Sequence, residues 1–176
     1  MRAASYCGCL EATRQLRRFG RKTHGDGSLV PVQRQLALPA ETTTRAKVLL
    51  NDLFADYALS GSSHPLAAIS AVNDVFLLLV PAFKGTASSG KMAVINLNGA
   101  FVSHHPSGIL VETLTLLSIL GTLHANLPQI TQVRFLVDGQ PKETLAGHAD
   151  LTRTYLTAND VPDENSVPQK TAENTP

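Results

Sequence analysis

The sequence predicts an α+β fold: a two-layer sandwich in which two helices cover one face of a small sheet of mixed or antiparallel strands. Three observations predict it. Apolar residues recur at helical spacing over residues 41–57 and again, more densely, over residues 107–126. Short apolar segments with the period of strands lie before, between and after these helices. The chain has 176 residues, 43% of them hydrophobic and 16% charged, which suits one domain with its own core.

The first third of the chain predicts an extended segment followed by a helix. Residues 1–28 form a basic segment without a regular hydrophobic period. Residues 29–39 alternate in part and contain two prolines, which predicts an edge strand or a connector. The helix over residues 41–57 has hydroxyl side chains at Thr42 to Thr44 as candidate caps. Its apolar stripe consists of Ala46, Leu49, Leu50, Leu53, Phe54 and Tyr57.

The remainder predicts strand, strand, helix and strand. Residues 74–80 and 92–97 predict a hairpin with a long, flexible tip. The helix over residues 107–126 is apolar over more than half of its circumference and should be the central buried helix, with Ser107 as its N-cap. Alternation through residues 133–137 predicts a strand, and Asp138-Gly139 a tight turn with a short return strand ending at Leu145. We expect a domain over residues 29–157 and a disordered polar tail over residues 158–176.

Charge and composition argue against several functions. The net charge is +1, and the basic residues at positions 14–22 have no aromatic residues arranged for base stacking, so we expect no nucleic-acid partner. The glycines form neither a dinucleotide-binding motif nor a phosphate-binding loop, so no cofactor is predicted. Cys7 and Cys9 are too close for good disulfide geometry and lack further metal ligands at standard spacing.

Histidines near the second helix raise the possibility of an enzyme. His104, His105, His148 and Asp150 carry ligand types that suit zinc, and the alternative function is a metal-assisted hydrolase that uses these four residues. Their spacing fits no standard ligand pattern, and hydrogen-bonded loop residues explain them better. Ser107 beside His105 suggests a nucleophile and base, but no nucleophile elbow accompanies them. The helix start could also hold an anion, which Glu112 would oppose. We therefore predict no catalytic residue and no metal.

Charged residues around the last predicted hairpin offer a surface for a partner. Arg134, Asp138, Lys142 and Glu143 are the candidate partner-binding residues. A solvated hairpin face with weak ion pairs is the alternative interpretation. Because an exposed sheet edge can recruit another strand, we expect docking through an edge strand and the hairpin of residues 133–145.

Several blocks of sequence occur in a fixed order between residues 29 and 157. They are Leu-Val-Pro-Val at 29–32, Ala-Val-Ile-Asn-Leu-Asn at 93–98, His-Pro-Ser-Gly at 105–108, Val-Arg-Phe-Leu-Val-Asp-Gly-Gln-Pro at 133–141 and Gly-His-Ala-Asp-Leu-Thr-Arg at 147–153. Through these blocks the chain resembles the GerMN domain family, named after a sporulation and spore-germination protein. The last two blocks are the most specific.

The resemblance implies an α+β domain similar to the ring-building motifs of sporulation and secretion machines. It implies a non-enzymatic interaction or scaffolding domain of the bacterial cell envelope, lipoprotein-like and tethered to the outer side of the cytoplasmic membrane. The implied partners are envelope proteins, with self-association among the possibilities, and membrane contact would come only through the tether. This sequence shows no signal or anchor, and taken literally it is soluble.

Two features depart from the family's pattern. Family members usually begin with an anchor or lipoprotein signal and an apolar strand, whereas residues 16–22 here read Leu-Arg-Arg-Phe-Gly-Arg-Lys, too basic for a central strand. We therefore expect the natural N-terminus to differ from the segment that begins at Met1. The chain also carries one copy of the domain where some relatives carry two, so a larger surface would require partners or self-association.

Overall fold

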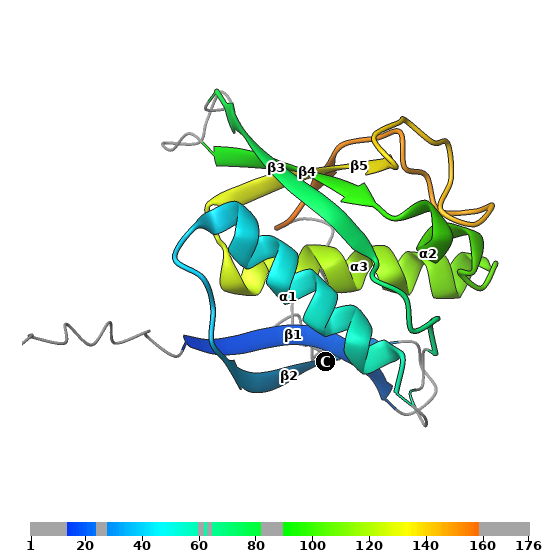
Figure 1. Cartoon of the computed structure of the whole chain (residues 1–176), viewed down its shortest axis with the longest axis horizontal. Helices are drawn as coiled ribbons and strands as arrows, with labels where there is room; N and C mark the ends of the chain where they lie inside the picture. The colour runs from blue at the N-terminus through cyan, green and yellow to red at the C-terminus, as the bar shows by residue number, and fades with distance from the viewer. Residues whose placement is uncertain (1–13, 24–27, 60–61, 63–64, 82–89, 159–176) are drawn as a thin grey trace, which may run out of the picture.

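The computed structural model describes residues 14–23, 28–59, 62, 65–81 and 90–158, with side chains from residue 36 onward. Its layers are a four-stranded sheet, two long helices below it and a two-stranded ribbon beyond the helices (Figure 1). Both long helices lie on one face of the sheet, which confirms the predicted α+β class. The elements in order are β1 (Arg14–Thr23), β2 (Ser28–Leu36), α1 (Thr42–Tyr57), β3 (Val72–Val80), β4 (Gly90–Leu97), α2 (Gly99–Ser103), α3 (Ile109–Asn126), β5 (Ile130–Val137) and β6 (Tyr155–Leu156).

The four-stranded sheet is mixed and has the order β3-β4-β5-β6. Strands β3 and β4 form the predicted antiparallel hairpin, with Leu77 opposite Ala93. Strand β5 runs parallel to β4 because α3 carries the chain across the sheet between them. The tip of the hairpin, residues 82–89, and the C-terminal residues 159–176 lie outside the described residues, as do Cys7 and Cys9.

Helix α1 buries the apolar stripe that the sequence predicts, which confirms its register. All six predicted residues lie in the core. The predicted hydroxyl cap is wrong, because the carboxylate of Glu41 accepts hydrogen bonds from the backbone N–H groups of Thr43 and Thr44 and from both hydroxyls. A longer side chain one residue earlier therefore satisfies the free N-terminal amides.

Helix α3 is the central buried helix, as predicted. Ten of its residues are buried, and its Ser118 hydroxyl lies 2.6 Å from the Tyr57 hydroxyl of α1. Among the described residues, α3 is the one helix whose length and hydropathy would suffice for a membrane span, and over half of that segment is buried within the protein. Burial on both sides, by the sheet and by the ribbon, explains why its sequence is so apolar.

The N-terminal region corrects one expectation. Residues 14–23 lie in the segment expected to be irregular, yet they form β1, which pairs antiparallel with β2 and lies against α3. The ribbon has a bulge between Phe19 and Arg21, next to Pro31 of β2. A strand of a two-stranded ribbon pairs along one edge, so β1 does not need the continuous apolar sequence of a central strand that is buried on both faces. The extended conformation expected for residues 29–39 is confirmed over β2.

The end of the sheet corrects a second expectation. Asp138 and Gly139 have φ angles of 47° and 78°, and Val137 bonds to Gln140 across them, so the predicted tight turn is confirmed. The predicted return strand ending at Leu145 is wrong, because the chain leaves the sheet after Gln140 and returns only at β6. The short helix α2, capped by Asn98, was also not predicted, since five residues are too few to show a helical period.

Candidate functional site

The carboxylate of Glu112 is the centre of a polar cluster at the start of α3. Glu112 is fully buried. Its Oε1 accepts from the Gly108 N–H at 3.0 Å and from the His148 ring at 2.9 Å. Its Oε2 accepts from three loop N–H groups, those of Ala146, His148 and Ala149, at 2.8–2.9 Å. One side chain therefore joins the first turn of α3 to a loop more than 30 residues later.

The electrostatics of Glu112 explain why a buried charge is tolerated. Burial alone would raise its pKa, but the backbone donors of Ala149, Gly108 and Ala146 and the His148 ring outweigh this and lower the pKa to about 2. The start of a helix adds its own positive potential. Glu112 is itself the anion at the helix N-terminus, so the site is already filled by the chain.

The loop from Ala146 to Ala149 is shaped to face this carboxylate. Gly147 has a φ of 120°, a conformation that residues with a Cβ rarely adopt. The Leu145 N–H bonds to the Ala149 carbonyl, which closes the loop on itself at 3.0 Å. This reversal presents several N–H groups to one oxygen, the arrangement of an anion-binding nest.

Ser107, His148 and Glu112 have the residue types of a catalytic triad but not its geometry. In a triad the carboxylate and the hydroxyl contact opposite nitrogens of the ring. Here Glu112 Oε1 at 2.9 Å and Ser107 Oγ at 3.4 Å both contact Nδ1. Because an ionised carboxylate only accepts, Nδ1 holds its proton toward Glu112 and cannot remove one from Ser107. Ser107 is also not the predicted N-cap, since Gly108 holds that position without a side-chain hydrogen bond.

The four candidate zinc ligands do not converge. His105 is buried, with Nδ1 2.8 Å from the Pro106 carbonyl and Nε2 2.9 Å from the Thr115 hydroxyl, so both ring nitrogens are engaged. Burial lowers the pKa of His105, partly offset by the Pro106 carbonyl and by Glu112. His104 Nδ1 bonds to the Ala100 carbonyl, and Asp150 bonds to Thr152. No group of three metal-binding side chains occurs among the residues that the structure describes, so the metal-hydrolase alternative lacks support.

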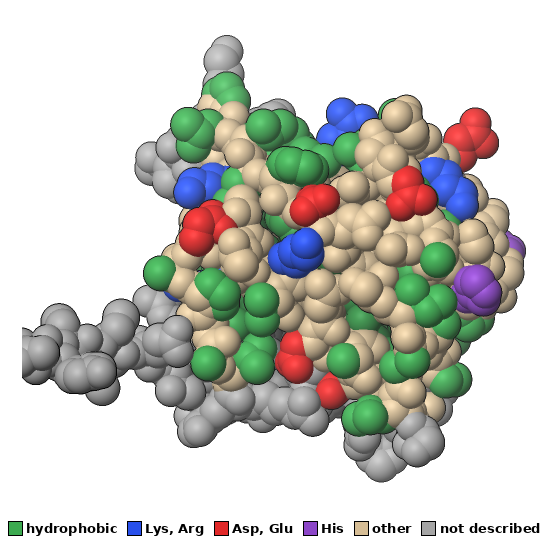
Figure 2. Space-filling view, viewed as in Figure 1, with side chains coloured by type: hydrophobic (Ala, Val, Ile, Leu, Met, Phe, Trp, Pro, Cys, Tyr) green, Lys and Arg blue, Asp and Glu red, His purple; other side chains and the backbone are tan. Residues whose placement is uncertain are grey.

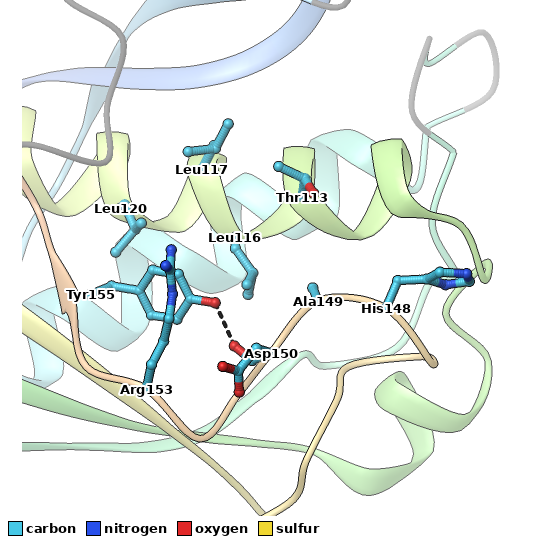
Figure 3. A pocket seen from close by; sticks show the side chains of 9 residues that line it. All are labelled: Thr113, Leu116, Leu117, Leu120, His148, Ala149, Asp150, Arg153 and Tyr155. Carbon is cyan, nitrogen blue, oxygen red and sulfur yellow. Dashed lines mark hydrogen bonds between the residues drawn. The ribbon is translucent and has the colours of Figure 1, made fainter.

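A groove of about 270 Å³ lies between α3 and the loop that leads to β6. Figure 3 shows leucines of α3 on one side and the side chains of Arg153 and Tyr155 on the other, with His148 at one end and pointing away from them. The Arg153 guanidinium stacks on the Tyr155 ring at 4.1 Å, and the Tyr155 hydroxyl donates to the Asp150 carbonyl. These contacts brace the wall of the groove.

The four predicted partner-binding residues lie on β5, in the turn that follows it and in the next loop. Arg134 is exposed on the outer face of β5, opposite Val94 of β4. Lys142 and Glu143 are exposed in the loop after the turn. Asp138 instead accepts from the Gly99 N–H at 2.9 Å and from the Asn73 side chain at 3.1 Å, bonds that hold the turn against α2 and β3. Their role in partner binding stays a prediction.

Sequence reasoning missed the central role of Glu112. The sequence suggested only that the negative charge of Glu112 would repel an anion bound at the start of the helix. The available signal was a glutamate in the first turn of an otherwise apolar helix, where a charge that is buried requires donors from elsewhere in the chain. Besides the His148 ring, the donors are four backbone N–H groups, which leave no mark in the sequence.

Together these features define a small α+β domain organised around a buried, fully hydrogen-bonded carboxylate. Residues 21–143 match the model of the Germane family, described as sporulation and spore germination. The chain therefore belongs to this family, which confirms the GerMN-like resemblance. No curated protein matches the sequence significantly.

Solved structures give matches of low identity. A candidate lipoprotein from Clostridium perfringens is 19% identical with a TM-score of 0.46, covering 90% of this chain and 94% of that one. The tandem GerMN domains of the sporulation protein GerM from Bacillus subtilis are 16% identical with a TM-score of 0.43, covering 80% of this chain and 45% of that one. The first GerMN domain of the same protein is 15% identical with a TM-score of 0.38, covering 82% and 96%.

Proposed function

We propose that this chain is a non-catalytic protein-interaction domain of the bacterial cell envelope, acting in an assembly related to sporulation or germination. The supporting observation concerns the cluster of Ser107, Glu112 and His148, which has the residue types of a catalytic site. Its main hydrogen bonds are made within the chain and hold the fold together. Glu112 uses both oxygens on its own chain, and the Nδ1 proton of His148 points to Glu112 rather than toward a nucleophile. Side chains that are hydrogen-bonded in this way stabilise the domain, and this arrangement suits a binding surface better than a catalytic site.

The membership in a sporulation and germination family supports the envelope assignment. Location outside the cytoplasmic membrane is part of the proposal, and fractionation of cells that express the full natural gene product tests it. Recovery in the cytosol would contradict it. Recovery with the membrane, released by detergent, would support a tether.

The exposed basic residues Arg134 and Lys142 are the proposed contacts for an envelope partner. Reversing both charges, Arg134→Glu with Lys142→Glu, should weaken capture of the partner from an envelope extract by about tenfold or more, because complementary charges govern encounter and register. The thermal midpoint should stay within about 2 °C, since both side chains are exposed.

Lys47→Glu is the matched control. It reverses one charge on α1, away from β5 and its turn, and is compared with each single reversal, Arg134→Glu and Lys142→Glu, as well as with the pair. Capture that survives the double reversal would exclude this face, and a wild-type chain that retains no specific partner would count against the interaction function itself.

A further inference from the structure

Strand β3 forms one edge of the four-stranded sheet and has no neighbouring strand beyond it among the described residues. In an antiparallel strand, alternate residues direct their backbone N–H and C=O groups away from the paired neighbour. At Val72 the Asn51 side chain of α1 satisfies them, accepting from the N–H at 3.2 Å and donating to the C=O at 3.4 Å. From Asp74 to Val80 no described side chain takes the place of Asn51, so this edge is available for pairing.

The free edge is also unusually apolar. Residues 75–80 read Val-Phe-Leu-Leu-Leu-Val, without a charge, and the first proline comes after the strand at position 81. Phe76 and Leu78 face outward from the sheet and are 53% and 49% exposed, while Leu79 near the tip is 82% exposed. Figure 2 shows hydrophobic side chains along this part of β3. Edge strands of monomeric proteins normally carry charges or prolines that prevent pairing, and β3 lacks both over this stretch.

We propose that β3 pairs with β3 of a second copy of this chain, antiparallel about a two-fold axis near Leu77, so that the two sheets become one. The proposal rests on the interaction function above and adds a second copy of the chain as a partner at a different surface. In this register Phe76 lies opposite Leu78 of the other copy on the same face of the sheet, and the same contact forms a second time by symmetry.

The charge and the size of the β3 edge favour a second copy of this chain as the pairing strand. Because residues 75–80 carry no charge, two copies approach without repulsion, and Asp74 at the end of the run is already paired with Lys47 at 3.5 Å. Residues 159–176 of the same chain are mostly polar and cannot supply a matching apolar strand. Pairing would bury roughly 1,000 Å² over both copies, below the roughly 1,200 Å² at which stable specific interfaces begin, so we expect a weak dimer that dissociates on dilution.

Sedimentation equilibrium over a wide range of protein concentration tests the proposal. The wild type should pass from monomer to dimer, and Leu78→Lys should raise the dimer dissociation constant about tenfold or more, because it removes both Phe76–Leu78 contacts and brings one positive charge from each copy close to the axis. Leu110→Lys is the matched control, since Leu110 is 53% exposed but lies on α3. It should leave the dissociation constant within about twofold.

Amide hydrogen exchange identifies the surface involved. In the wild type, amides of residues 75–80 should gain protection as the protein concentration rises, and in Leu78→Lys they should not. A wild type that stays monomeric, a dimer that Leu78→Lys leaves intact, or a monomer whose β3 is protected only by an envelope partner each overturns self-pairing. None of these results removes partner binding through Arg134 and Lys142, which the capture experiment measures separately.

Discussion

The cluster around Glu112 and the free edge of β3 are opposites. The first is polar and rich in residues that suggest chemistry, yet its carboxylate and its donors are paired within the chain. The second contains no motif at all, yet its outer backbone groups have no strand beyond them among the described residues, and Phe76, Leu78 and Leu79 are 53%, 49% and 82% exposed. Residue types alone therefore do not identify a functional surface. What matters is which hydrogen-bonding groups and apolar areas remain unsatisfied after folding.

The largest expected effect comes from removing the buried carboxylate. Glu112→Ala leaves four backbone N–H groups without their acceptor, three of them in the loop that faces α3. We expect a loss of about 3–5 kcal/mol in the free energy of unfolding, measured by urea denaturation. Glu143→Ala, on the exposed surface, should change it by less than about 0.5 kcal/mol. A small loss for Glu112→Ala would mean that water replaces the carboxylate as the acceptor. The Glu112 cluster would then not be essential to the fold.

Acid should weaken the same cluster without any mutation. The pKa of Glu112 is about 2 in the folded state against an ordinary value of 4.5, so the unfolded state binds a proton first as the pH falls. The stability that Glu112 contributes is complete above pH 4.5 and is lost as the pH falls toward 2, a change of about 3 kcal/mol. The measurement is the free energy of unfolding against pH for wild type and Glu112→Gln. Equal slopes in the two proteins would assign acid sensitivity to other carboxylates.

His105 should act in the same direction at higher pH, with a smaller effect because the Pro106 carbonyl and Glu112 partly offset its burial. Its pKa is lowered in the folded state, so its contribution to stability is present above pH 6.5 and decreases as the pH falls below that value. Thermal midpoints of wild type and His105→Gln between pH 7.5 and 5.5 measure this effect. A loss of stability that is the same in both proteins over this interval would rule out His105 as its source.

The smallest expected effect lies at the β3 edge. Leu78→Lys should change the free energy of unfolding of the monomer by less than about 0.5 kcal/mol, because half of this side chain is in solvent already. Urea denaturation at a concentration well below the dimer dissociation constant measures it. A loss above about 1 kcal/mol would show that Leu78 supports the fold itself, as the residues of the Glu112 cluster do.

The parts of the fold that sequence predicts are those with a long, regular hydrophobic period. The stripe of α1, the apolar α3 and the strands β3, β4 and β5 all follow from such patterns. Strand β1 could not be predicted in this way, because its ten residues include five basic ones and show no regular hydrophobic period. Strand β6 has two residues, and its place beside β5 depends on a loop of 17 residues that no local rule aligns.

The candidate site, too, was only partly predictable from the sequence. The sequence placed Ser107, His148 and Glu112 at the start of a helix and in a distant loop, but it could not state which nitrogen of His148 faces which partner. It also could not show that Asp138 bonds to Gly99 and Asn73 rather than to solvent. Hydrogen-bond partners distant in the chain are set by the packing of whole elements, and backbone donors are the same for every residue except proline.

By itself, then, the sequence determined the class of the fold, the two helices and their buried faces, and the family, because hydrophobic period and ordered motifs are properties of the chain. Only the tertiary structure decided that Glu112 is bonded within the fold and that β3 lies at an open edge. The reason is physical: burial and pairing depend on which surfaces meet, and helix, loop and sheet edge meet only after the chain has folded.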